Sequence, residues 1–276
     1  MTPLRQRMLE DLSRYNYAPR TQQAYVAQIA RLARHFGVSP DQLTREQVQE
    51  YQDLLASQHV SWLPQAVAAM QFLYNKTLGR DWTIAHSPRP KPKDLPTVLT
   101  PEEVSRLLGA VEPPKARMLL TTMYGCGLRI SEAVRLEVRD IDSGRMVIHI
   151  RQGKGRKDRY VPLGTTLLKE LREYWRRERP SSFLFPGSQA DKPIGVAAVR
   201  EEFRLAKRIA GIETPCTTHT LRHSYASHCL QAGMEVGVIQ QILGHANLET
   251  TATYTHVAES TTGTGSAFPD LLDENL

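Results

Sequence analysis

Hydrophobic residues recur at helical spacing through the first 84 residues, and this stretch shows little sign of any strand. We predict four helices between residues 4 and 84. The second has a candidate cap at Thr21 and a stop at Gly37, and the third opens with a capping-box pattern, Thr44 followed by Gln47. The fourth covers about residues 61–79. The apolar positions of these three helices are Tyr25, Ile29, Leu32 and Phe36, then Val48, Tyr51 and Leu55, then Val67, Met70 and Tyr74.

A proline-rich segment, HSPRPKPKDLP, separates this helical bundle from the rest of the chain. Its four prolines, three basic residues and lack of any aliphatic residue before Leu95 exclude a packed element. A new helix then opens at Thr100, with Pro101 at its first position and Glu103 three residues after the cap. We therefore divide the chain into a helical domain at 1–85, a linker at 86–97, a larger domain at 98–258 and a tail at 259–276.

The larger domain begins with helices and then changes its hydrophobic period. A helix at 116–124 ends in Gly125, Cys126 and Gly127, which predicts a sharp bend, and a new helix begins near Ser131. MVIHI and RYVPL predict two antiparallel strands, 146–150 and 159–163, joined by the turn QGKGRKD. Further helices are predicted at 165–178, 196–210, 219–231, 235–243 and 249–257. The expected fold class is mainly α with a small antiparallel β-sheet.

Composition and charge favour a globular protein that binds a polyanion. The 276 residues exceed one typical domain of roughly 100 to 200 residues. Residues 1–258 carry 35 Lys and Arg against 25 Asp and Glu, and such a surface suits nucleic acid because each phosphate contact releases counterions. No run of about 18 apolar residues and no signal-peptide start is present, and the three cysteines are irregularly spaced. We expect a cytoplasmic protein with no membrane segment.

Five local patterns in the larger domain carry reactive side chains: GCGLRISEAV, QGKGRKDR, HTLRHSYASH, LGH and TATYTHV. Each pattern alone is weak. Together they supply a phenol, two guanidinium groups, a lysine and two imidazoles, which is what phosphoryl transfer without a metal or nucleotide cofactor requires. The residues are Arg129, Lys154, His219, Arg222, His245 and Tyr254.

The expected chemistry follows from the negative charge that spreads over the phosphate oxygens in the transition state. Arginine suits this charge because its planar fork stays protonated and donates two hydrogen bonds to phosphate. Arg129 lies at a glycine-rich bend before a helix start, where backbone N–H groups also favour an anion. Lys154 at the tip of the strand turn would protonate the leaving 5′ oxygen. Tyr254 would then remain covalently attached to the phosphate, which conserves the bond for rejoining.

This set of motifs resembles the tyrosine recombinase family, the site-specific recombinases of the phage-integrase type. The likeness extends from the helical amino-terminal domain to about residue 258, and it is sharpest in the HxLRH spacing at 219–223, in LGH at 243–245 and in a tyrosine nine residues later. The resemblance implies that Arg129 and Arg222 clamp the scissile phosphate and that Lys154 is the general acid. It also implies that His219 and His245 assist proton transfer and phosphate binding, with Tyr254 as the nucleophile.

The same resemblance implies the domains and partners. The first domain would be a SAM-like helical core-binding domain, and the second the catalytic domain. The partner would be double-stranded DNA, bound by a homotetramer on two paired sites.

Several other readings of these residues stay open from the sequence. Arg129 could simply pair with Glu132, and Tyr254 could be a half-buried structural tyrosine. Cys216, His219 and His223 spell CxxHxxxH, although no second paired motif completes a zinc site. Two other functions also remain, a type IB topoisomerase and a catalytically silent DNA-binding relative.

Overall fold

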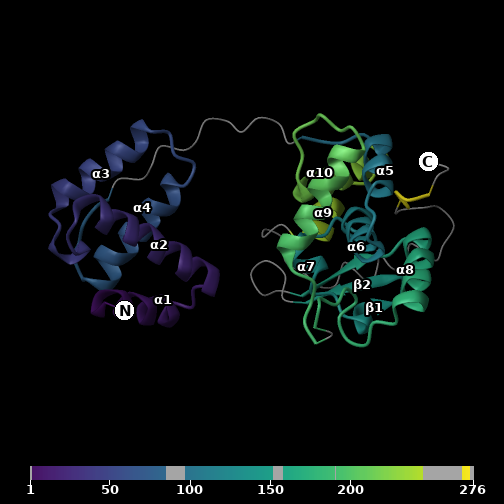
Figure 1. Cartoon of the computed structure of the whole chain (residues 1–276), viewed down its shortest axis with the longest axis horizontal. Helices are drawn as coiled ribbons and strands as arrows, with labels where there is room; N and C mark the ends of the chain where they lie inside the picture. The colour runs from purple at the N-terminus through teal and green to yellow at the C-terminus, as the bar shows by residue number, and fades with distance from the viewer. Residues whose placement is uncertain (1, 85–96, 152–157, 190, 245–268, 274–276) are drawn as a thin grey trace. The chain divides into compact units, whose positions relative to one another are not determined.

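The computed structural model describes residues 2–84, 97–151, 158–189, 191–244 and 269–273. The chain divides into two compact units, Met1–Lys93 and Asp94–Leu276. Each has its own hydrophobic core. Both are mainly helical (Figure 1).

The first unit is a helical bundle whose longest helix packs along α4. Its elements are α1 (Pro3–Arg14), α2 (Pro19–Phe36), η1 (Pro40–Gln42), α3 (Arg45–Ser57), α4 (Leu63–Gln71) and a π-helical turn η2 (Phe72–Thr77). The capping box of Thr44 and Gln47 is formed, and Gly37 ends α2 in the left-handed conformation with φ 69°. The predicted bundle is therefore confirmed.

Two details of that prediction were wrong. Thr21 does not cap α2, because Pro19 already occupies its first turn and Ala18 is the cap residue. The fourth helix is not continuous from 61 to 79: it begins at Leu63 and changes to π winding at Phe72. The wider turn places Phe72, Leu73, Tyr74 and Thr77 all in the buried interior.

The second unit is organised around α6 (Pro114–Gly125), which packs against both α8 and α10 (Figure 1). Eight residues of α6 are buried, as its apolar sequence predicts. The helices that surround it are α5 (Pro101–Gly109), α7 (Ile130–Ala133), η3 (Val138–Asp140), α8 (Thr165–Glu178), α9 (Val196–Ile209), α10 (Thr218–Gln231) and α11 (Val236–Leu243). The capping box at Thr100 is formed as predicted.

A three-stranded antiparallel sheet, β1-β2-β3, completes this unit. β2 (Val147–Ile150) pairs with β3 (Arg159–Pro162), with Ile150 opposite Arg159. The sequence predicted these two strands but not β1 (Ile141–Asp142), since two residues are too few to show an alternating pattern. The fold class, mainly helical with a small antiparallel sheet, is confirmed. The predicted helix at 249–257 lies outside the described residues.

Part of the tail, residues 269–273, lies against the second unit. The Asp270 carboxylate accepts hydrogen bonds from the Thr166 amide, 2.8 Å, and the Thr165 hydroxyl, 3.1 Å, in the first turn of α8. Leu271 and Leu272 pack against the main core. Asp270 therefore caps a helix whose own cap residue, Gly164, has no side chain to do so. Among the described residues, no helix is both long enough and apolar enough to cross a bilayer.

Candidate active site

The glycine-rich bend after α6 places Arg129 in a half-buried position on the second unit. Gly127 has φ +60°, and a Cβ there would lie 2.5 Å from the Tyr225 ring and 2.8 Å from the Leu243 side chain. No side chain fits in this space, so the bend packs directly against α10 and the end of α11. The bend thus brings together three segments that are far apart in the sequence.

Arg129 does not use the helix that follows it in the way the sequence suggested. α7 has only four residues, and its capping box closes on the Glu132 carboxylate. That carboxylate accepts from the Arg129 amide at 2.9 Å and from its guanidinium at 2.8 Å. The amide expected to attract an anion is therefore already bonded to Glu132, and the guanidinium supplies the charge. Arg129 therefore does pair with Glu132, although the carboxylate is buried and the pair is not a solvated one. A role of Arg129 in phosphate binding stays a prediction.

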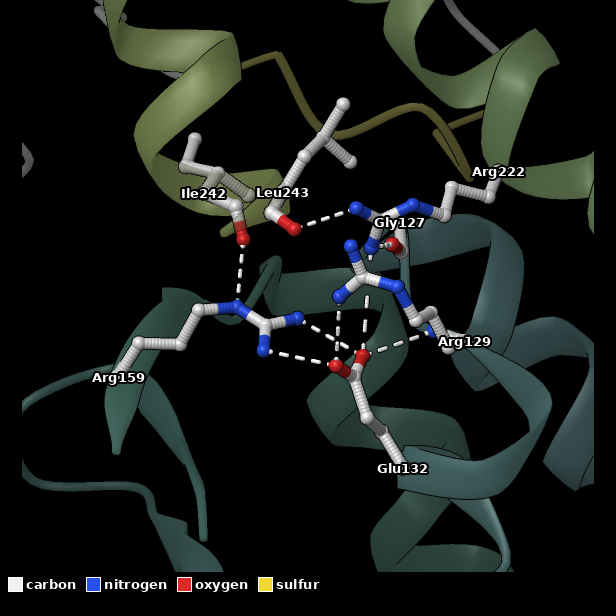
Figure 2. A network of polar contacts seen from close by, with 7 residues as sticks. All are labelled: Gly127, Arg129, Glu132, Arg159, Arg222, Ile242 and Leu243. Atoms are coloured by element: carbon white, nitrogen blue, oxygen red, sulfur yellow. Dashed lines mark hydrogen bonds and ion pairs between the residues drawn. The ribbon is translucent and has the colours of Figure 1, made fainter. Parts of the chain in front are cut away.

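Glu132 also binds a second arginine, which the sequence did not single out (Figure 2). Arg159, at the start of β3, donates to both carboxylate oxygens, at 2.9 and 2.8 Å. Its Nε donates to the carbonyl of Ile242 in the last turn of α11, at 2.8 Å. Arg159 and Glu132 are both buried, and this two-pronged geometry is the strongest that an arginine forms with a carboxylate.

Arg222 reaches the same place from α10 (Figure 2). Its guanidinium donates to the carbonyl of Gly127 at 2.7 Å and to the carbonyl of Leu243. It also lies 4.0 Å from the Glu132 carboxylate. These two carbonyl bonds use two of the five N–H donors that a guanidinium carries. Arg222 is thus held between the glycine bend and the end of α11, with its charge beside those of the other two arginines.

The cluster of Arg129, Arg159, Arg222 and Glu132 is strongly cationic, with three positive charges against one negative. Burial lowers the pKa of Arg222 to about 9, and the nearby positive charge of Arg129 is a second, smaller cause. The side chain therefore still carries its charge at neutral pH. Burial opposes ionisation of Glu132, but the hydrogen bonds and charge of Arg159 outweigh it and lower that pKa to about 2. A buried site with excess positive charge favours an anionic ligand such as a phosphodiester.

The other candidate residues are placed less completely. His219 lies exposed in the first turn of α10, with its ring 4.6 Å from that of His223. Arg222, three residues later in the same helix, is buried, so the structure exposes one of these two side chains and buries the other. Lys154, His245 and Tyr254 lie outside the described residues.

Polar side-chain contacts hold the residues on both sides of the segment of Lys154. Arg151, directly after β2, lies 2.7 Å from the buried carboxylate of Asp140. His149 in β2 contacts the Asp158 carboxylate at 3.1 Å and stacks on Tyr160 of β3, with ring centroids 4.7 Å apart. The start of the predicted turn is therefore linked to η3 through Asp140, and its end is linked across the hairpin to β2.

The described part of the chain contains no group of three His, Cys, Asp or Glu side chains arranged to hold a metal ion. Cys216, from the CxxHxxxH spelling, is half-buried, and burial raises its thiol pKa, which disfavours a metal-binding thiolate. A metal-independent site stays a prediction.

Comparison with protein families gives two matches that together span most of the chain. The model described as "Phage integrase family" matches residues 97–261. The model described as "Phage integrase, N-terminal SAM-like domain" matches residues 4–84.

The chain is also similar in sequence to integrase/recombinase relatives and similar in fold to solved structures. A putative integrase/recombinase of Sinorhizobium fredii, y4qK, is 48% identical over 94% of this chain and 85% of its own length. An integrase/recombinase of Escherichia coli is 34% identical over 90% of this chain and 88% of its own. A lambda integrase dimer bound to a COC′ core site is similar in fold, with a TM-score of 0.71 and 15% identity over 88% of this chain and 94% of that one. XerH bound to a palindromic difH substrate has a TM-score of 0.68 and 20% identity over 90% and 79%.

Proposed function

Because the chain belongs to the phage integrase family of tyrosine recombinases and is a site-specific DNA recombinase, we propose that it cuts and rejoins strands through Tyr254. The observation that carries the proposal is the buried cluster around Glu132. Arg129 and Arg222, chosen from the sequence as the phosphate clamp, come from different helices and meet at this one cationic spot. The other four roles rest on the family resemblance and on the chemistry of the residue types.

In the proposed reaction the Tyr254 phenolic oxygen attacks the phosphorus of one DNA strand and gives its proton to an imidazole, that of His219 or His245. The new bond joins phosphorus to the tyrosine oxygen, and the bond from phosphorus to the 5′ oxygen breaks. Lys154 protonates the departing 5′ oxygen, so a free 5′ hydroxyl and a 3′-phosphotyrosine result. Attack by the 5′ hydroxyl of another strand reverses these steps and restores the phenol.

The arginines stabilise the charge that builds up on the phosphate oxygens during both steps. Arg129 and Arg222 are already oriented by Glu132 and by backbone carbonyls, so little reorganisation is needed when the phosphate arrives. We assign His219 and His245 to proton transfer and to phosphate binding. No metal or nucleotide enters this scheme.

The partner we propose is double-stranded DNA, bound by four protomers on two paired sites. The basic body of the chain supports binding to DNA. A similar fold occurs in a lambda integrase tetramer bound to a Holliday junction, with a TM-score of 0.72. That relative is only 17% identical, so the assembly of this chain is part of the proposal.

The test is a suicide DNA substrate, nicked so that the strand released by cleavage diffuses away. The wild type should form a protein–DNA adduct that survives denaturation, and Tyr254→Phe should abolish it. Tyr15→Phe removes an exposed hydroxyl in the first unit and should leave the yield unchanged. An adduct of equal yield from Tyr254→Phe would refute the nucleophile. A wild type that binds DNA but never forms an adduct would indicate a silent relative. Abolition by excess chelator would contradict the metal-free scheme.

A further inference from the structure

Arg159 makes contacts that reach beyond its own strand to two segments carrying predicted catalytic residues. Its guanidinium binds both oxygens of Glu132, which in turn binds Arg129. Its Nε binds the carbonyl of Ile242 at the end of α11. We propose that Arg159 is a positioning residue for the recombination reaction, which sets the place of Arg129 and of the end of α11. This inference rests on the proposed function.

The position of Arg129 depends on Arg159 through the carboxylate they share. Without Arg159, Glu132 would keep its bonds from the amide and guanidinium of Arg129 and its 4.0 Å contact with Arg222. It would lose the two-pronged partner that bonds both of its oxygens from the opposite side. The bonds from Arg159 fix both oxygens at once, and the Arg129 guanidinium then has one acceptor in one place. Buried pairs of this kind are costly to break because each partner left alone is an uncompensated charge.

The end of α11 depends on Arg159 in two ways. The last carbonyls of a helix have no partner within the helix, and Arg159 binds that of Ile242 while Arg222 binds that of Leu243. Gly244 then turns the chain with φ +62°, and a Cβ at this position would lie 3.1 Å from Cδ and 3.2 Å from Nε of Arg159. The turn at Gly244 therefore packs against the Arg159 side chain. His245 is the next residue in the sequence.

A lysine cannot reproduce these contacts, although it preserves the charge. Its single ammonium group is a point donor, whereas the arginine fork reaches two carboxylate oxygens and a carbonyl in fixed directions. Arg159→Lys therefore keeps the positive charge and removes the directed hydrogen bonds of the guanidinium. The matched control is Arg204→Lys, because Arg204 also pairs with a glutamate, Glu201, but on the exposed face of α9.

The experiment measures two quantities for each variant, the affinity for the DNA site and the single-turnover rate of adduct formation at saturating protein. For Arg159→Lys we expect unchanged affinity and a rate lower by about 10- to 100-fold, since misplacement by about 1 Å has effects of that size. Arg204→Lys should match the wild type in both. If the ion pair of Arg159 and Glu132 were purely structural, its loss in Arg159→Lys would lower thermal stability and leave the cleavage rate unchanged. A rate of Arg159→Lys equal to that of the wild type, measured well below the melting temperature of the variant, therefore overturns the proposal.

A substrate with sulfur in place of the leaving 5′ oxygen distinguishes which group Arg159 positions. A thiolate leaves without being protonated, so this substrate should restore cleavage to Lys154→Ala. It should not restore Arg159→Lys, because the phosphate clamp would still be displaced. Full restoration of Arg159→Lys would assign the defect to delivery of the proton and would overturn the proposed link to Arg129.

A second variant guards against the case in which Arg159→Lys does not fold. Gly244→Ala leaves every charge in place but presses a methyl group against Arg159. Its control is Gly211→Ala, which has the same backbone strain at φ +63° with no atom within 4 Å of the added carbon. We expect adduct formation by Gly244→Ala to be about 10-fold or more slower than by Gly211→Ala. Equal rates contradict the inference, whereas no adduct from the wild type would instead refute the proposed function.

Discussion

The buried Glu132 carboxylate should make the stability of the second unit depend on pH in a way that one substitution removes. Its pKa falls from the ordinary value of 4.5 to about 2 in the folded protein. At about 1.4 kcal/mol per pH unit, the difference corresponds to about 3 kcal/mol of stabilisation. Because the folded pKa is depressed, this stabilisation is present above the unfolded pKa and is lost as the pH falls towards the folded value.

Between neutral pH and pH ~3, roughly 2 kcal/mol of the Glu132 contribution should disappear. Glu132→Gln has no carboxylate to protonate, so its free energy of unfolding should fall less steeply over the same range. It should also be less stable at neutral pH by roughly 3 to 5 kcal/mol, because the buried arginines lose their counter-charge.

The assay is urea unfolding at several pH values, followed by the fluorescence of Trp175, the one tryptophan of the second unit's sequence. Trp62 and Trp82 are replaced by Phe in every protein compared, so that the first unit is silent. Glu201→Gln changes an exposed glutamate and should follow the wild-type curve. Parallel curves for the wild type and Glu132→Gln would refute the argument, because they would show that this carboxylate takes up as many protons in the folded protein as in the unfolded one.

Three further outcomes are expected. Arg222→Ala should keep most DNA affinity but lower the rate of adduct formation by about 10² or more, the usual effect of losing a fixed donor to a developing oxyanion; an unchanged rate would argue against the clamp. Asp270→Ala should destabilise the second unit by about 1 kcal/mol in urea unfolding, since it removes the side chain that caps α8, and the exposed Asp191→Ala serves as its control. DNA affinity should fall with salt, with a log–log slope of about −0.9 per phosphate contacted, and a flat response would contradict binding to the backbone.

Much of the fold could be predicted from local sequence signals. α8 has the predicted bounds, and the capping boxes at Thr44 and Thr100 begin helices where expected, because both signals act within a few residues. β1 and the π-helical turn η2 were missed because each is a short departure from a regular period. The length of α7 was also missed, since nothing in the sequence around Ser131 marks its early end.

The site was predictable only where a motif marked it. Arg129 and Arg222 stand in recognisable patterns, and the structure brings them together. Arg159 closes the network through Glu132, 27 residues away, and Ile242, 83 residues away, and such distant pairings follow from the tertiary fold. The sequence marked Arg159 only as the first residue of the predicted strand 159–163. The catalytic roles of all six residues, Arg129, Lys154, His219, Arg222, His245 and Tyr254, stay predictions.

Besides the Glu132 carboxylate, the acceptors that hold Arg159 and Arg222 in place are peptide carbonyls, those of Gly127, Ile242 and Leu243. Every amino acid brings the same carbonyl, so exchanging Ile242 or Leu243 for another aliphatic residue leaves these acceptors intact. Alanine scanning of Ile242 and Leu243 would therefore not reveal the role of their carbonyl groups. Insertion or deletion of one residue between Gln241 and Gly244 would move both α11 carbonyls by a residue and detach both arginines. In this part of the chain, length is under stronger constraint than side-chain identity.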